Sequence, residues 1–88
     1  MSRGKRVKAV LPPDFDAPLS LETVAQAVKS RRTQLGLDMK TTAMLSGVSI
    51  VTLSKIEHAS KGVRLESVLK VAHALGITIK ISDWRNDA

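Results

Sequence analysis

The stretch over residues 38–57 most constrains what this chain can fold into. Asp38 is suited to cap a helix that starts one residue later, because its carboxylate can accept a hydrogen bond from a free N–H of the first turn. That helix must end by Gly47, since glycine takes a positive φ without steric cost. Ser49 is a second N-cap and opens a helix over residues 50–57. The stretch therefore predicts two short helices joined by a tight turn.

Two helices joined by a turn that contains glycine form a helix-turn-helix, whose second helix enters the major groove of DNA. The charge agrees with a polyanionic partner: 14 Lys and Arg against 8 Asp and Glu give a net charge of +6. The apolar runs are far shorter than the roughly 18 residues of a membrane span. The basic start is followed by too few apolar residues for a signal peptide. We expect a cytoplasmic, nucleoid-associated protein.

The 88 residues make one small domain without cysteine, so tight helix packing or a partner subunit must stabilise it. Apolar residues at helical spacing predict two further helices, over 20–35 and 65–75. The side chains expected in the core are Leu21, Val24, Ala25, Val28 and Leu35, then Leu65, Val68, Leu69, Ala72 and Leu75. Lys29, Arg31 and Arg32 are expected on the surface. The fold class is all-α, with four to five helices and a DNA-binding domain over 20–76.

Residues 1–19 form a basic arm that contains three prolines, which forbid a regular helix. Four of the first eight residues are Lys or Arg. Two interpretations stay open: an arm that lies along phosphates or in a minor groove, or a solvated, disordered tail. Phe15 either pins the arm to the body or is exposed.

The residues after the last helix, 77–84, change period, because three isoleucines alternate with polar residues. These are Ile77, Ile79 and Ile81. The pattern predicts a strand with one buried face. A lone strand has unpaired N–H and C=O groups, so we expect it to pair with the same strand of a second subunit about a two-fold axis. The alternative is an extended tail lying on the helices.

Trp84 has three interpretations: it closes the small core, it anchors a partner protein, or it is exposed. Residues 85–88 are a polar tail. An enzyme is not expected. Ser67 and Lys70 match a Ser-x-x-Lys motif, but its companion motifs are missing. His58 and His73 lie too far apart in sequence to indicate a metal site, and no cofactor is expected.

Residues 24–77 resemble the Cro/repressor-type, or XRE-like, helix-turn-helix family. The motifs that carry the resemblance are Leu35-Gly36-Leu37, Ala43, Gly47-Val48-Ser49, Thr52-Leu53-Ser54-Lys55-Ile56-Glu57 and the run 65–77. With its isoleucine-rich C-terminal strand, the chain is most similar to HipB-type antitoxins. That similarity implies a homodimer that represses its own operon, binding operator DNA and a kinase-fold, HipA-like toxin. The alternative function is a stand-alone XRE-like regulator; a weaker third option is a protein that only bridges other proteins.

The resemblance also implies which residues contact DNA. Ser49 resembles a phosphate contact, Ile50 and Val51 occupy positions that usually face base edges, and Ser54 and Lys55 follow on the next exposed turn. With flanking basic and hydroxyl side chains, the expected DNA-binding set is Lys40, Ser49, Ile50, Val51, Thr52, Ser54, Lys55, Lys61 and Arg64.

Some residues of the motif have other expected roles. Glu57 is expected to brace the motif against Arg31 or Arg32. Five positions depart from the family. Met39 replaces a glutamine, Thr42 a leucine and Ala59 a glycine, and Ile50 and Val51 cannot make the bidentate contacts that Asn, Gln or Arg make to purines.

Overall fold

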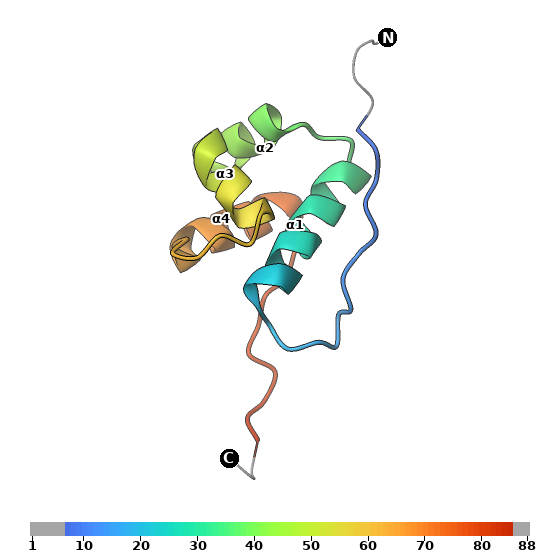
Figure 1. Cartoon of the computed structure of the whole chain (residues 1–88), viewed down its shortest axis with the longest axis vertical. Coiled ribbons are helices and arrows are strands. Elements are labelled where there is room, and N and C mark those ends of the chain that lie inside the picture. Colours follow the sequence, from blue (N-terminus) through green and yellow to red (C-terminus); the bar gives the residue numbers. More distant parts are fainter. Residues whose placement is uncertain (1–6, 86–88) are drawn as a thin grey trace.

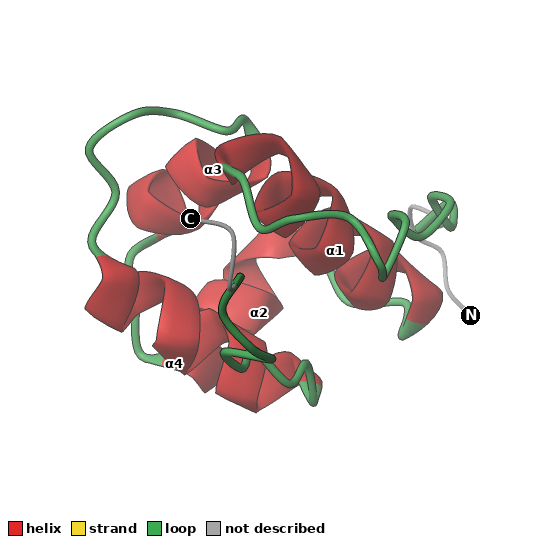
Figure 2. Ribbon diagram, turned by 90° about the horizontal axis from the view of Figure 1, so that it is seen from below, coloured by secondary structure: helices red, strands yellow, loops and turns green. Residues whose placement is uncertain are grey.

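The computed structural model describes residues 7–85, and within them the chain forms four helices around one core. They are α1 (Leu21–Gln34), α2 (Met39–Ser46), α3 (Ile50–Glu57) and α4 (Leu65–Leu75). Helix α1 packs on α3 and α4, and α2 packs on the same two helices (Figures 1 and 2). The all-α prediction is confirmed with four helices, the lower number expected.

The helix ends follow the local signals of the sequence. Three side chains cap helices: Ser20 Oγ accepts from the N–H of Thr23 at 3.1 Å, and Asp38 Oδ1 accepts from that of Thr41 at 2.7 Å. Ser49 Oγ accepts from the N–H of Thr52 at 3.0 Å. Each bond satisfies a backbone donor that the first turn leaves free. The predicted caps are therefore confirmed.

The core is built by seven buried apolar side chains from all four helices. They are Val28, Ala43, Leu53, Ile56, Val68, Val71 and Leu75. The prediction for α4 was wrong in part, because Leu65 and Leu69 are 64% and 45% exposed and Val71 is fully buried. The buried stripe consists of residues 68, 71, 72 and 75, an i, i+3, i+4, i+7 face that shares residues 68, 72 and 75 with the expected one and adds Val71.

Three positions of α1 and its C-cap also differ from the prediction. Leu21 and Leu35, at the two ends of the helix, are exposed rather than in the core. Arg32, expected on the surface, is buried with Glu57 of α3 in the only ion pair among residues 7–85. Its Nε and Nη2 donate to the two carboxylate oxygens at 2.6 and 3.0 Å, and its Nη1 donates to Leu37 O at 2.8 Å. The expected bracing by Glu57 is confirmed, with Arg32 as its partner.

The C-terminal segment leaves α4 as an extended chain, and residues 77–85 contain no regular strand. Ile77 and Ile79 are half-buried against the core, whereas Ile81 is 92% and Trp84 80% exposed. Trp84 therefore does not close the core of this chain. A strand that forms only on pairing with a second subunit stays a prediction.

The N-terminal segment, residues 7–19, lies alongside α1 (Figure 1). Phe15 is 83% exposed and does not pin the segment to the body. The predictions for the rest of the basic arm, residues 1–6, and for the end of the polar tail, residues 86–88, lie outside the described residues. The division into arm, DNA-binding domain, strand and tail stays a prediction.

Candidate nucleic-acid interface

The buried residues of α3 fix the position of this helix on the rest of the molecule. Leu53 and Ile56 are fully buried, and Glu57 is bonded to Arg32 of α1. The turn before α3 is fixed by Gly47, whose φ is +72°, and by Val48, which packs against the core. These contacts fix the orientation of α3 on the helical body, and they leave Ile50 and Val51 outside the core.

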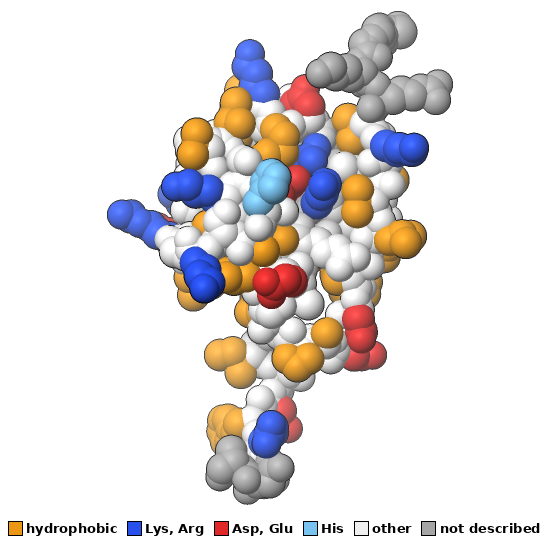
Figure 3. Space-filling model, in the orientation of Figure 1, with side chains coloured by type: hydrophobic (Ala, Val, Ile, Leu, Met, Phe, Trp, Pro, Cys, Tyr) orange, Lys and Arg blue, Asp and Glu red, His pale blue; other side chains and the backbone are white. Residues whose placement is uncertain are grey.

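The expected DNA-binding residues lie on α3 and on the segments before and after it, and all are exposed or half-buried. Ile50 and Val51 in the first turn of α3 are 48% and 64% exposed. The other exposed members of the expected set are Lys40, Ser49, Lys55, Lys61 and Arg64, and the half-buried ones are Thr52 and Ser54. The basic members come from the start of α2, the end of α3 and the α3–α4 loop. Figure 3 shows Lys and Arg side chains spread over one face of the helical body.

The hydroxyl groups of this surface are already partly engaged. Ser49 Oγ donates to Thr52 Oγ1 at 3.0 Å, so these two side chains form one unit at the start of α3. His58 Nδ1 lies 2.7 Å from the carbonyl oxygen of Ser54 and 3.4 Å from its Oγ. Sequence reasoning missed this role of His58 at the end of α3, although its spacing of four residues from Ser54 is a visible signal.

Asp38 is an acidic group among these basic residues. Hydrogen bonds from the backbone N–H and from the side chain of Thr41 hold the pKa of the Asp38 carboxyl below its usual range, and Lys40 and Arg32 lower it further. The carboxylate is thus ionised where it caps α2. Lys40, two residues later, is exposed and carries the opposite charge at the same end of the helix.

The departures from the family at residues 39, 42 and 59 each have a structural consequence. Met39 is half-buried and packs against the core, so this position offers no side chain to a phosphate. Thr42 is fully buried, and its hydroxyl is satisfied by donating to Asp38 O at 2.8 Å. Ala59 has a φ of +55°, a left-handed conformation that favours glycine.

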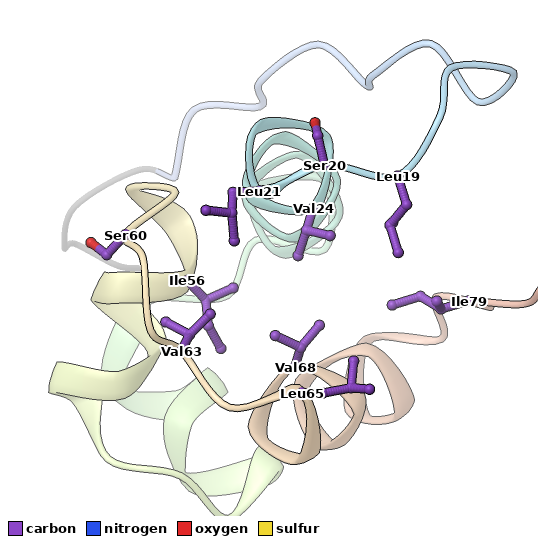
Figure 4. Close-up of a pocket in the computed structure, with 10 residues that line it drawn as sticks. All are labelled: Leu19, Ser20, Leu21, Val24, Ile56, Ser60, Val63, Leu65, Val68 and Ile79. Atoms are coloured by element: carbon purple, nitrogen blue, oxygen red, sulfur yellow. The ribbon is translucent and has the colours of Figure 1, made fainter.

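Other kinds of site find little support in residues 7–85. A hollow of about 240 Å³ between α1, α3 and α4 is lined by apolar side chains and two serines, without a titratable group (Figure 4). No cluster of three His, Asp or Glu side chains in this part of the chain could hold a metal ion. Nor does any of the four helices have the length and hydrophobicity of a membrane span.

Comparison with known proteins agrees with this geometry. A family model described as "Helix-turn-helix" matches residues 28–81, and the chain belongs to this family of DNA-binding regulators. It is similar to HipB, as solved in a complex of a HipB variant with an O2 20mer. The match covers 82% of this chain and 100% of that chain, with a TM-score of 0.70 and 24% sequence identity. At that identity the likeness establishes the fold, and the predicted resemblance to HipB-like, XRE-type proteins is confirmed. Comparison with the curated proteins gave no match.

Proposed function

We propose that this protein is a sequence-specific, dimeric transcriptional repressor that reads operator DNA with α3. The observation that carries the proposal is the exposure of Ile50 and Val51 on a helix whose other side is fully buried. In a major groove, these side chains can pack on thymine methyl groups, a contact that discriminates A·T from G·C pairs. The Ser54 hydroxyl adds a polar group that can bond to a base edge or a phosphate.

Affinity in this proposal comes mainly from the basic residues around α3. Lys40, Lys55, Lys61 and Arg64 lie on three successive elements and can each neutralise a phosphate. Each such contact adds about 0.9 to the dependence of log affinity on log salt concentration. Base contacts by two aliphatic side chains discriminate only modestly, so DNA shape supplies part of the specificity.

The dimer is proposed to form through residues 77–84 of two subunits. Ile77 and Ile79 already pack on their own core, which leaves the backbone edge of the segment to pair with its copy. Ile81 is highly exposed in the single chain and would be covered in the dimer. A two-fold dimer would place its two α3 helices on half-sites about one helical turn of DNA apart.

We infer further that the repressor is the antitoxin of a HipBA-like module, which autoregulates its operon and binds a kinase-fold, HipA-like toxin. The fold shared with HipB supports this inference. Trp84, 80% exposed at the end of the chain, is the side chain best suited to anchor such a partner. The alternative is a stand-alone XRE-like regulator that acts without a toxin.

The repressor proposal is tested by gel-shift titration against the protein's own promoter DNA and a scrambled duplex at two salt concentrations. We expect selective binding that survives the higher salt and is lost in the variant Ile50→Asp/Ser54→Asp. The variant Leu69→Asp/His73→Asp adds the same charges to the exposed side of α4 and should retain binding. Equal binding to both duplexes that vanishes with salt would contradict sequence-specific reading and leave only the basic surface.

The antitoxin proposal is tested by co-expression with the product of any adjacent reading frame that encodes a kinase fold. We expect a stable complex and relief of growth arrest, both weakened by Trp84→Ala. Absence of such a reading frame, or of a complex with its product, would favour the stand-alone regulator.

A further inference from the structure

The imidazole ring of His58, the residue that ends α3, is held by the backbone of that helix. Its Nδ1 lies 2.7 Å from the carbonyl oxygen of Ser54 and 3.4 Å from Ser54 Oγ. A carbonyl oxygen can only accept a hydrogen bond, so Nδ1 carries a proton and donates it. This bond fixes both the tautomer of the neutral ring and its orientation.

The backbone of this helix end is fixed as well. The N–H of His58 donates to Ser54 O at 3.0 Å, and the N–H of Ser60 donates to Lys55 O at 2.9 Å. Both bonds satisfy carbonyl groups that the last turn of a helix leaves free. The structural role of His58 is therefore complete, and it uses only one of the two ring nitrogens.

The second ring nitrogen, Nε2, has no hydrogen-bond partner among the described residues, and His58 is exposed. Residues at i, i+3, i+4 and i+7 lie on one side of a helix. Val51, Ser54, Lys55 and His58 follow this spacing, while the buried residues of α3 take the other side. The ring is thus on the same side as three residues of the expected DNA-binding set.

The place of His58 along α3 indicates which part of the DNA it meets. In a helix-turn-helix, the N-terminal residues of the reading helix contact base edges. Ile50 and Val51 hold that place in the proposed complex, and His58 is at the other end of the helix. It therefore lies beyond the base-reading turn, where the helix leaves the groove and approaches the sugar-phosphate backbone.

The charge around this end of α3 agrees with a phosphate ligand. Lys55, one turn before His58, and Lys61, in the loop after it, are both exposed. The acidic neighbour, Glu57, is bonded to Arg32 and does not offset these charges. A surface with an excess of cations favours a polyanion.

We propose that His58 is a further DNA-contacting residue, which donates a hydrogen bond from Nε2 to a phosphate of the DNA backbone. The inference rests on the proposed DNA binding by α3. Because Nδ1 already donates to Ser54 O, donation from Nε2 requires protons on both nitrogens, and the ring then carries a positive charge. A ring that is neutral in the free protein takes up one proton from solvent on binding. Affinity for DNA should therefore rise as the pH falls.

The elements packed on α3 carry charges of their own. Besides the pair of Arg32 and Glu57, they include Asp38 and Lys40 on α2, Lys61 and Arg64 in the α3–α4 loop, and Glu66 on α4. Every variant in the test keeps all of these groups. A difference in pH dependence between a variant at residue 58 and the wild type therefore belongs to the ring.

The test uses two substitutions that each reproduce one ring nitrogen. His58→Asn keeps an N–H near the position of Nδ1 and removes the group at Nε2. His58→Gln offers an N–H near the position of Nε2 and gives up the short bond to Ser54 O. His73→Asn is the matched control, because His73 is the other histidine of the chain and is exposed on α4. Circular dichroism and thermal melting establish that each variant is folded.

DNA titrations across a salt series, at about pH 6 and about pH 8, compare the promoter and scrambled duplexes. At the lower pH we expect His58→Asn to reduce the salt slope by about 0.9 and the affinity at about 0.1 M salt by up to about eightfold, for each bound subunit. The loss should be equal on both duplexes, because phosphate contacts carry no sequence information. Between the two pH values the wild type and the control should lose more affinity than either His58 variant.

Stability and binding should rank the two His58 variants in opposite orders. His58→Gln should melt at a lower temperature than His58→Asn, because it loses the bond that caps α3. It should nevertheless bind DNA more tightly than His58→Asn, because it still offers a donor to the phosphate. A purely structural role of His58 predicts the same order for both properties.

Unchanged affinity and slope in His58→Asn at the lower pH would overturn the inference, and so would parallel pH profiles of the wild type and the His58 variants. Binding losses that follow the melting temperatures would leave only the capping role. A loss confined to the promoter duplex would replace the phosphate by a base edge. A wild type that does not distinguish the two duplexes refutes the proposed sequence-specific reading instead, while the variants still decide the role of His58 on either duplex.

Discussion

Removing the charge of Glu57 should be among the most destabilising single changes outside the apolar core. The side chains of Arg32 and Glu57 are only 10% and 4% exposed and share two short hydrogen bonds, so Glu57→Gln leaves a guanidinium buried without its counterion. Breaking a buried pair from one side costs about 3–5 kcal/mol. That is a large part of the roughly 5–15 kcal/mol by which small domains are stable. At about 4–8 °C per kcal/mol, the melting temperature should fall by at least about 12 °C.

Urea denaturation followed by circular dichroism measures this loss directly, with Glu66→Gln as the control because Glu66 is an exposed acid in the first turn of α4. The control should change the free energy of unfolding by less than about 1 kcal/mol. The double variant Arg32→Met/Glu57→Leu removes both charges and should cost clearly less than the sum of its single variants. A loss below 1 kcal/mol for Glu57→Gln, or strict additivity in the double variant, would refute the reasoning.

Three further changes test local features of the fold. Ala59→Gly should raise the free energy of unfolding by up to about 1 kcal/mol, because the gain from relieving the left-handed strain exceeds the cost in unfolded-chain entropy. Gly62→Ala, at a φ of +83°, should lower the free energy of unfolding. Urea denaturation that gives the two variants the same change in this free energy would contradict the account. Ser46→Ala should raise the melting temperature, since the buried Ser46 Oγ has no hydrogen-bond partner among the described residues; a lower one would mean that the hydroxyl is satisfied. The lowered pKa of Asp38 predicts stabilisation that is complete above the unfolded-state pKa and lost as pH falls through the folded-state pKa. Acid titration should therefore destabilise the wild type more than Asp38→Asn, and parallel pH profiles would argue against the cap.

The parts of the fold that sequence reasoning predicted well depend on short-range chemistry. Ser20, Asp38 and Ser49 cap helices through bonds to residues three positions away, and Gly47 and Gly76 end helices at φ values of +72° and +73°. Both kinds of signal are complete within a few residues. They could therefore be read without knowing how the helices pack.

The parts that it missed depend on helix pairing. Arg31 and Arg32 are adjacent and both belong to the last turn of α1, and only the packing of α1 on α3 selects Arg32 for Glu57. Arg31 instead donates from Nε to Leu75 O at 2.9 Å, which ties α1 to the end of α4. In α4 the apolar residues are too many to define one stripe, so contact with the other helices decides that Val71 is buried and Leu65 is not.

The exposure of Ile50 and Val51 was more predictable than the burial of the core residues, for a physical reason. A residue that reads DNA must be free of structural contacts, and the regular spacing of Leu53, Ile56 and Glu57 already assigns the inner side of α3. The residues left over, above all Ile50 and Val51, are then exposed whatever the exact packing of α1 and α4. The same separation means that substitutions on the outer side can change which DNA is bound without changing stability, because they remove no contact to the core. The burial of the C-terminal segment is harder to predict. Ile81 and Trp84 are exposed in the single chain, and whether a second chain covers them cannot be read from the spacing of apolar residues in one chain.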